Sequence, residues 1–211
     1  EHFARLITEG TITREEGLTF ADSPTNLLWR LQNDKPGGQT RQPPKKEEQA
    51  SDEAMIAQAK RLKEVLAGSG VPLIINDRLN VAHASGADGL HVGQSDTDVM
   101  QARQVLGEQA IIGLSINTLE QLQRAPVALL DYVGLGPVFA TGSKQDHAQP
   151  IGFAGLAQLA SACPLPSVAI GGLKAEHAAQ VKAAGAHGLA VISAICGHPD
   201  PRQAAQAFFR S

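Results

Sequence analysis

Aromatic side chains are scarce in this 211-residue sequence, where phenylalanine, tryptophan and tyrosine together make up 4% of the residues. Its core must therefore be built mainly from aliphatic residues, as is usual for a parallel sheet wrapped in helices. Cysteine occurs only at Cys163 and Cys196, without the spacing of a metal site. Isolated thiols of this kind are typical of a reducing compartment, and we expect a cytoplasmic protein.

Long apolar runs and an excess of one charge are also missing. No run approaches the roughly 20 residues that span a bilayer. The formal net charge of −3 argues against a broad surface for nucleic acid or membrane. The chain has neither a Walker-type loop nor the Gly-rich fingerprint of a dinucleotide-binding unit. No serine or cysteine occupies a nucleophile elbow, which argues against covalent catalysis.

Composition divides the chain into three parts. Residues 1–34 contain helix-start signals, among them a capping box formed by Thr13 and Glu16, and we expect a helical segment. Residues 35–51 combine glycines, prolines and cancelling charges, which is typical of a linker. We expect the remaining residues, 52–211, to form one domain.

This domain alternates between apolar runs and helical patterns with a repeat of about 25 residues, the spacing of β/α units. The turn ASGADG at 84–89 is echoed by AGAHG at 184–188, four units later, as an eight-stranded barrel would show. Six units leave an open six-stranded sheet as an alternative. Strands are expected within 71–77, 88–94, 110–116, 131–139, 165–173 and 187–195, and helices within 52–70, from about 81, within about 97–106 and 118–124, and within 152–162, 175–184 and 201–210.

Polar side chains follow the carboxyl ends of these strands, where parallel β/α proteins place their working residues. Asp77 and Asp96 follow neighbouring strands, so their carboxylates could share one Mg²⁺ ion. Alternatively, each aspartate is a helix N-cap. His91 lies within an expected strand and is interpreted as a packed histidine of the core rather than a base.

The segment 141–144, Thr-Gly-Ser-Lys, follows a buried apolar strand. Its glycine permits a close backbone approach, its hydroxyls and amides can donate hydrogen bonds, and Lys144 adds a positive charge. The segment is interpreted as a clamp for phosphate or pyrophosphate, or alternatively as an ordinary turn with a solvated lysine. Gly171-Gly172 and Ile192-Ser193 end the last two expected strands, where barrels often bind phosphate on backbone amides.

Six motifs in this order, IINDR, ADGLHVGQSD, IIGLSI, GLGPVFATGSK, VAIGGL and AVISAI, resemble thiamine-phosphate synthase over about residues 52–210. The resemblance implies a (β/α)8 barrel of the TIM type. It also implies a transferase of thiamine biosynthesis that joins an aminopyrimidine methyl pyrophosphate to a thiazole phosphate and releases pyrophosphate. In that dissociative reaction Mg²⁺ draws off the leaving group, and the thiazole nitrogen captures a pyrimidine carbocation.

The same resemblance assigns roles to individual residues. Asp77 and Asp96 would hold the metal, while Asn76 and Lys144 would bind the pyrophosphate. Ser115 would face the reacting pyrimidine, so Ser115 and Lys144 are the expected catalytic residues. Contacts to the thiazole phosphate would come from Thr141, Ser143, Gly172, Ile192 and Ser193.

The chain departs from the family pattern upstream, where two further β/α units and a pyrophosphate-binding Gln-x-Arg-x-Lys signature are expected but not found. Residues 1–34 instead resemble the C-terminal tail of type IV pilus retraction ATPases, a resemblance that implies no ATPase activity. The first two units are therefore missing, divergent or replaced, and exposed strand edges would favour a homo-oligomer. Two alternatives to the synthase stay open: a thiazole tautomerase-like enzyme, or a non-catalytic relic that binds phosphate ligands.

Overall fold

The computed structural model describes residues 51–140, 149–196 and 198–209. Of these described residues, those up to Val191 form one compact unit, and those from Ile192 onward belong to a second unit. The expected helical segment 1–34 lies outside the described residues, as does the expected linker apart from Ser51. Both segments, and the boundaries assigned to them, stay predictions.

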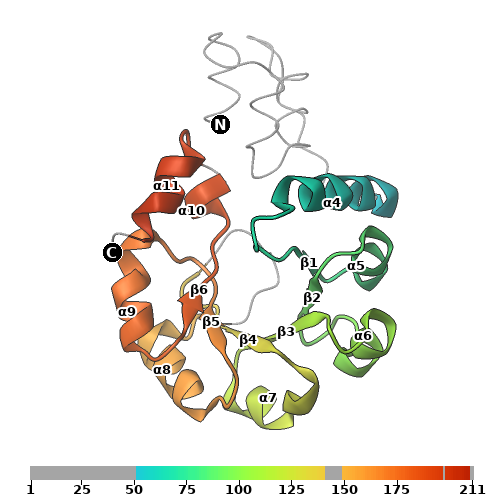
Figure 1. Ribbon diagram of the computed structural model, residues 1–211. Coiled ribbons are helices and arrows are strands. Elements are labelled where there is room, and N and C mark those ends of the chain that lie inside the picture. Colours follow the sequence, from blue (N-terminus) through green and yellow to red (C-terminus); the bar gives the residue numbers. More distant parts are fainter. Residues whose placement is uncertain (1–50, 141–148, 197, 210–211) are drawn as a thin grey trace, which may run out of the picture. The chain divides into compact units, whose positions relative to one another are not determined.

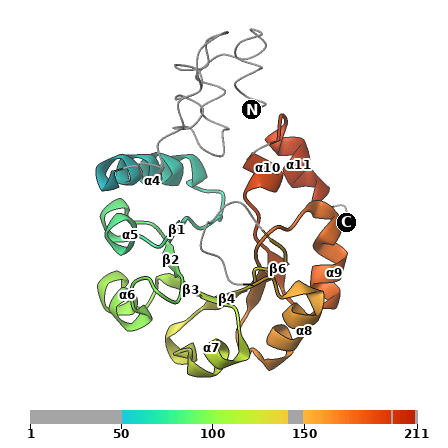
Figure 2. The same cartoon turned by 180° about the vertical axis from the view of Figure 1, so that it is seen from behind.

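The first unit contains one parallel sheet whose strands are ordered as they occur in the chain. Figures 1 and 2 show that this sheet is curled, with the helices from α4 to α9 around its outer side. The expected α/β class is confirmed, and the eight-stranded closure stays a prediction. The strands are β1 (Ile74–Asn76), β2 (Gly89–Val92), β3 (Ile111–Ile116), β4 (Tyr132–Leu135), β5 (Ser167–Ala169) and β6 (Gly188–Leu189).

The helices of this unit lie close to their expected ranges, and several begin at side-chain caps. The Ser51 hydroxyl accepts from Ala54 N at 3.3 Å, and the Thr118 hydroxyl accepts from Gln121 N at 3.2 Å. The helices are α4 (Asp52–Leu66), α5 (Leu79–Ser85), α6 (Val99–Leu106), α7 (Leu119–Arg124), η1 (Val127–Leu129), α8 (Gly152–Ala162), η2 (Ala175–His177) and α9 (Ala178–Ala183).

The described part of the second unit contains α10 (Ser193–Cys196) and α11 (Pro201–Ala207). Asp200 caps α11 by accepting from Gln203 N at 2.9 Å. The expected strand 187–195 is therefore shorter than predicted, because β6 ends at Leu189 and α10 follows. Among the helices that the structure describes, none is long and apolar enough to cross a bilayer.

The curled sheet presents two chemically different faces. The alternate positions Leu90 and Val92, with their counterparts on β3 and β4, are almost fully buried on the helix-covered face. Burial of each such side chain stabilises the fold by about 1.5–3 kcal/mol. The opposite, concave face carries smaller and polar side chains, namely Asn76, His91, Gly113, Ser115, Tyr132 and Gly134.

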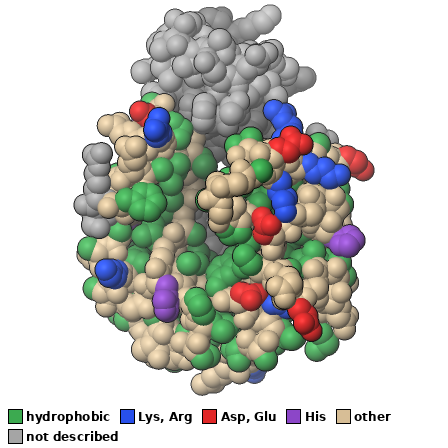
Figure 3. All heavy atoms as spheres, viewed as in Figure 1, with side chains coloured by type: hydrophobic (Ala, Val, Ile, Leu, Met, Phe, Trp, Pro, Cys, Tyr) green, Lys and Arg blue, Asp and Glu red, His purple; other side chains and the backbone are tan. Residues whose placement is uncertain are grey.

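Side chains of like charge do not form a cluster on the face of the molecule shown in Figure 3. Acidic and basic groups lie beside one another there, among apolar and neutral side chains. This mixture agrees with the small formal net charge of −3. That face therefore has no basic stripe of the kind that follows a nucleic-acid backbone.

The residues that directly precede β2, β4 and β6 each make the same two-point contact with a residue in the preceding strand or directly before it. Each donates its backbone N–H to a carbonyl and accepts, through its side chain, from the N–H of the same partner. Asp88 and His187 occupy equivalent positions in the two echoed turns, so the echo has a structural basis. The pairs are Asp88 with Leu73, Asp131 with Ile112 and His187 with Ser167, at 2.8–3.2 Å.

The lowered pKa of Asp88 leads to a prediction of how the stability of the fold depends on pH. The Leu73 N–H and the ammonium of Lys63, 3.0 Å from Oδ1, lower the pKa of Asp88 below its ordinary value of 3.8. A lowered pKa contributes stability that is present above pH 3.8 and is lost as the pH falls through the folded-state value. We expect Asp88→Asn to lower the Tm at neutral pH and to reduce the loss of Tm on acidification. Glu108→Gln, at an exposed carboxylate, is the control; equal pH profiles for the two variants would contradict this role.

Candidate active site

Sequence-predicted polar residues meet at one edge of the sheet, because β1, β2 and β3 are parallel neighbours. Asn76 is the last residue of β1 and is exposed, and Asp77 follows it. Asp96 lies in the loop after β2, and Ser115 lies one residue before the end of β3. The Gln94 amide donates to the Ser115 carbonyl at 2.7 Å and ties the second loop to the third strand.

Asp77 occupies an unusual backbone conformation at this edge. Its φ of 63° lies in the left-handed region, and the Arg78 N–H donates to the Asn76 carbonyl across it at 2.8 Å. This three-residue turn is anchored because Asp77 N donates to the His91 carbonyl of β2 at 2.8 Å. Asp77 Oδ1 is buried. Strain of this kind concentrates at binding and catalytic positions.

Asp96 is exposed, and its carboxylate closes its own loop. Oδ2 accepts from Gly93 N at 2.7 Å. A Cβ atom at Gly93 would lie 2.8 Å from that oxygen, so a larger residue there would require the Asp96 carboxylate to shift. The N-cap interpretation is wrong for both aspartates, because α5 has Arg78 at its N-cap and α6 has Asp98.

The two carboxylates are suitable ligands for a hard divalent ion. Mg²⁺ is commonly held by one or two carboxylates, with water and substrate phosphate oxygens completing its octahedron. Asp77 and Asp96 offer that donor set from neighbouring strands. The described residues contain no group of three or more histidine, cysteine, aspartate or glutamate side chains able to hold a metal by themselves.

The concave face also contains a hydrogen-bonded group that sequence reasoning missed. His91 Nε2 lies 2.9 Å from Ser115 Oγ, and His91 Nδ1 lies 2.9 Å from Tyr132 Oη. The histidine is half-buried. It is therefore not an isolated side chain of the core, but the centre of a network that spans β2, β3 and β4. An inward-facing polar residue on each of three consecutive strands was the available signal.

A second group of predicted residues lies farther along the sheet, where the segment after β4 runs beside β5. Val138 N donates to the Ile170 carbonyl at 2.8 Å, and Phe139 N donates to the Gly171 carbonyl at 3.1 Å. Gly172 has φ 64°, and a Cβ atom there would lie 2.8 Å from the Ala140 carbonyl oxygen. The predicted phosphate-binding Gly172 is therefore packed against the residue that precedes Thr141.

Several predicted site residues are not among the described residues of this unit. Thr141, Ser143 and Lys144 lie outside the described residues. Ile192 directly precedes α10, and Ser193 is its first residue; both belong to the second unit. Their predicted contacts with the thiazole phosphate stay predictions.

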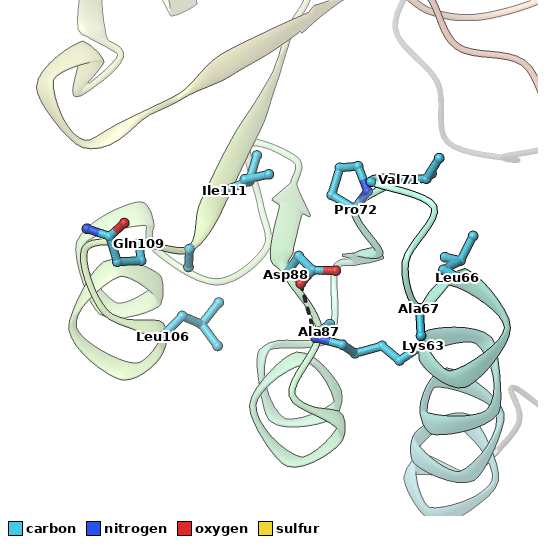
Figure 4. A pocket seen from close by; sticks show the side chains of 12 residues that line it. Lys63, Leu66, Ala67, Val71, Pro72, Ala87, Asp88, Leu106, Gln109 and Ile111 are labelled. Carbon is cyan, nitrogen blue, oxygen red and sulfur yellow. Dashed lines mark hydrogen bonds and ion pairs between the residues drawn. The ribbon is translucent and has the colours of Figure 1, made fainter.

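A cavity of about 630 Å³ lies at the other end of the strands. Its lining includes Pro72 before β1, Asp88 before β2 and Ile111 at the start of β3. Figure 4 shows Lys63 and Asp88 pointing toward each other across it. Because these charged groups pair with one another and the amino ends of barrel strands serve mainly stability, we do not assign this cavity to catalysis.

Comparison with known proteins identifies the family. A family model described as thiamine monophosphate synthase matches residues 35–195. The chain belongs to this family. The match begins at Lys35, within the segment predicted to be a linker, and covers all six described strands.

Individual members of the thiamine monophosphate synthase family agree with this assignment. The thiamine-phosphate synthase of Psychrobacter sp. (strain PRwf-1) is 56% identical over 164 residues, which cover 76% of each chain. That of Azorhizobium caulinodans is 44% identical over 205 residues, covering 95% of this chain and 90% of the relative. An alignment of that length reaches into residues 1–34.

Solved structures share this fold. The thiamine phosphate pyrophosphorylase from Pyrococcus furiosus superposes with a TM-score of 0.70 at 32% identity, covering 77% of this chain and 78% of that one. A 3-hexulose-6-phosphate synthase gives a TM-score of 0.55 at 21% identity, covering 72% and 78%. At that identity, the second likeness concerns the fold alone.

Proposed function

We propose that this chain is a thiamine-phosphate synthase, which joins an aminopyrimidine methyl pyrophosphate to a thiazole phosphate and releases pyrophosphate. The supporting observation is that Asp77, Asp96 and Ser115 lie at one edge of the sheet in a chain of this family. Such a reaction needs charge neutralisation and positioning rather than a protein nucleophile. The site has acidic and hydroxyl side chains suited to those tasks.

Asp77 and Asp96 are the residues that would hold Mg²⁺. The bound ion would neutralise charge on the departing pyrophosphate. Asp77 suits this role because its turn is fixed by the β2 backbone, and Asp96 because its loop is fixed by Gly93. The backbone of Asp77 and the carboxylate of Asp96 are therefore positioned before any ligand arrives, which reduces the cost of organising the site.

The other predicted residues divide between the two substrates. Asn76 would donate its side-chain amide to the pyrophosphate, and the Lys144 ammonium would add a positive charge there. Ser115 would contact the pyrimidine. Backbone amides suit a phosphate, and the thiazole phosphate is assigned to Thr141, Ser143, Gly172, Ile192 and Ser193.

A partial form of the pyrophosphate signature lies where the family match begins. Gln39-Thr40-Arg41 has the spacing of the first two positions of Gln-x-Arg-x-Lys, and Pro43 replaces the lysine. We assign Gln39 and Arg41 to pyrophosphate binding on this spacing. The absence of the third position is the specific feature that favours the alternative of a phosphate-binding relic, whereas Asp77 and Asp96 argue against a tautomerase.

The two outermost strands of the described sheet, β1 and β6, leave both sides of the sheet open to pairing. Within the described sheet, β1 pairs only with β2 and β6 pairs only with β5. Unpaired edges are prone to pairing with other strands. Either residues 1–34 complete an eight-stranded barrel, or a second copy covers the edges in a homo-oligomer. We place the enzyme in the cytoplasm, in agreement with its two free cysteines.

The test is an assay of the purified chain with both substrates, with and without Mg²⁺. We expect pyrophosphate and thiamine phosphate to form in equal amounts, and only when both substrates and the ion are present. Binding of thiazole phosphate without product would show a relic. Conversion of a thiazole substrate without pyrophosphate release would show a tautomerase. Either result would contradict the proposed synthase.

A further inference from the structure

The polar network on the concave face is centred on one histidine. His91 contacts Ser115 Oγ through Nε2 and Tyr132 Oη through Nδ1, both at 2.9 Å. The rings of His91 and Tyr132 lie with their centroids 5.4 Å apart and tilted by 35°. Both ring nitrogens are thereby engaged, which fixes the rotation of the imidazole.

Two glycines on the neighbouring strands leave room for these side chains to contact one another. His91 lies opposite Gly113, and Gly113 lies opposite Tyr132, so all three occupy one row of the sheet. A Cβ atom at Gly113 would lie 2.2 Å from Tyr132 Cζ and 2.5 Å from His91 Nδ1. A Cβ atom at Gly134 would lie 3.1 Å from His91 Cε1. Glycine at these positions leaves the space in which the network forms.

The network controls the direction of the Ser115 hydroxyl. A serine side chain has three staggered rotamers, and the bond to His91 selects among them. Burial raises the pKa of the Tyr132 hydroxyl above its ordinary value of 10.0, so Tyr132 stays neutral and can share a hydrogen with Nδ1. In either tautomer of His91, Ser115 Oγ keeps at least one lone pair for a ligand.

We infer that His91 is a positioning residue that holds Ser115 Oγ toward the pyrimidine, with Tyr132 holding the His91 ring. The inference rests on the proposed synthase function. As pyrophosphate leaves, the pyrimidine becomes electron-poor, and a correctly placed oxygen lone pair stabilises it more than it stabilises the neutral substrate. Because His91 acts through Ser115, its loss is expected to lower kcat more than it raises KM.

Two amide substitutions of His91 separate positioning from packing. The amide of Gln reaches about as far as Nε2 and can still contact Ser115, whereas the shorter Asn reaches only about as far as Nδ1. We expect His91→Gln to retain kcat and His91→Asn to lower it roughly 10- to 100-fold, the range for a misplaced reacting group. A packing role alone would not separate the two variants in this way.

A double-mutant cycle identifies the residue through which His91 acts. In a Ser115→Ala background, His91→Asn is expected to cause no further loss of kcat. Tyr132→Phe is expected to reduce kcat modestly, and again only when Ser115 is present. Val92→Ala, on the opposite face of β2, is the control for destabilisation and is expected to change Tm without changing kcat per folded molecule.

The outcomes distinguish this inference from the proposed function. A wild-type chain that forms no thiamine phosphate would overturn both. An active wild type in which His91→Asn and His91→Gln behave alike would overturn the inference and leave the synthase intact. The same holds if His91→Asn lowers kcat equally in the Ser115→Ala background, because His91 would then act independently of Ser115.

Discussion

Asp96→Asn is expected to lower kcat/KM by roughly 10²- to 10³-fold at a fixed Mg²⁺ concentration, because a metal ligand contributes several kcal/mol to transition-state stabilisation. The asparagine oxygen can still accept from Gly93 N, so the loop and the Tm should change little. Part of the lost activity should return at higher Mg²⁺ concentration. Steady-state kinetics over a Mg²⁺ series measures the effect.

Asp98→Asn is the matched control for that substitution. Asp98 lies in the same loop, but its carboxylate caps α6 by accepting from Met100 N at 2.8 Å. Asparagine is as good an N-cap as aspartate, so this variant should keep both its stability and its activity. Equal losses for the two variants would show that loop charge, and not a specific ligand at position 96, supports the reaction.

Gly171→Ala is expected to destabilise the fold by roughly 2–4 kcal/mol, the sum of left-handed strain and overpacking. Gly171 has φ 89°, and a Cβ atom there would lie 2.4 Å from the Cβ of Pro137. Pro137 begins the segment that leads to Thr141, so the collision should also displace the predicted phosphate clamp and reduce activity. Thermal unfolding followed by kinetics tests both parts.

Gly68→Ala separates the two causes of that destabilisation. Gly68 has a similar φ of 76°, but no atom lies within 4 Å of the position of its Cβ. It should therefore show only the strain, about 1–2 kcal/mol, and normal kinetics. If both variants lose the same stability and both remain fully active, the close packing of Gly171 on Pro137 has no functional role.

The sequence was sufficient to predict most of the architecture, because each β/α unit contains its own periodic pattern. The strand from 111 to 116 and the helix from 152 to 162 occur within one residue of their expected bounds. The last strand was predicted too long, since the apolar residues after Leu189 suit a strand or a helix equally well. The strand-end rule also led to Asp77 and Asp96, which follow the neighbouring strands β1 and β2.

The site was less predictable where it depends on contacts between distant parts of the chain. The left-handed turn at Asp77 is fixed by pairing with β2, which a local pattern does not contain. His91 was interpreted as a packed core histidine from its place within a strand, and its partners lie 24 and 41 residues away, where no local pattern shows them. Gly113 permits these contacts because it has no side chain. This role can be recognised only once the strand register is known.

The central claim is that Asp77 and Asp96 bring a divalent ion and pyrophosphate together. The most direct measurement replaces Mg²⁺ by paramagnetic Mn²⁺ and records the ³¹P relaxation of pyrophosphate bound to the protein. We predict strong broadening of the ³¹P signal with wild type and its loss in the Asp77→Asn/Asp96→Asn double variant. Equal broadening in the two proteins would contradict the claim, because the ion and the pyrophosphate would then meet without these carboxylates.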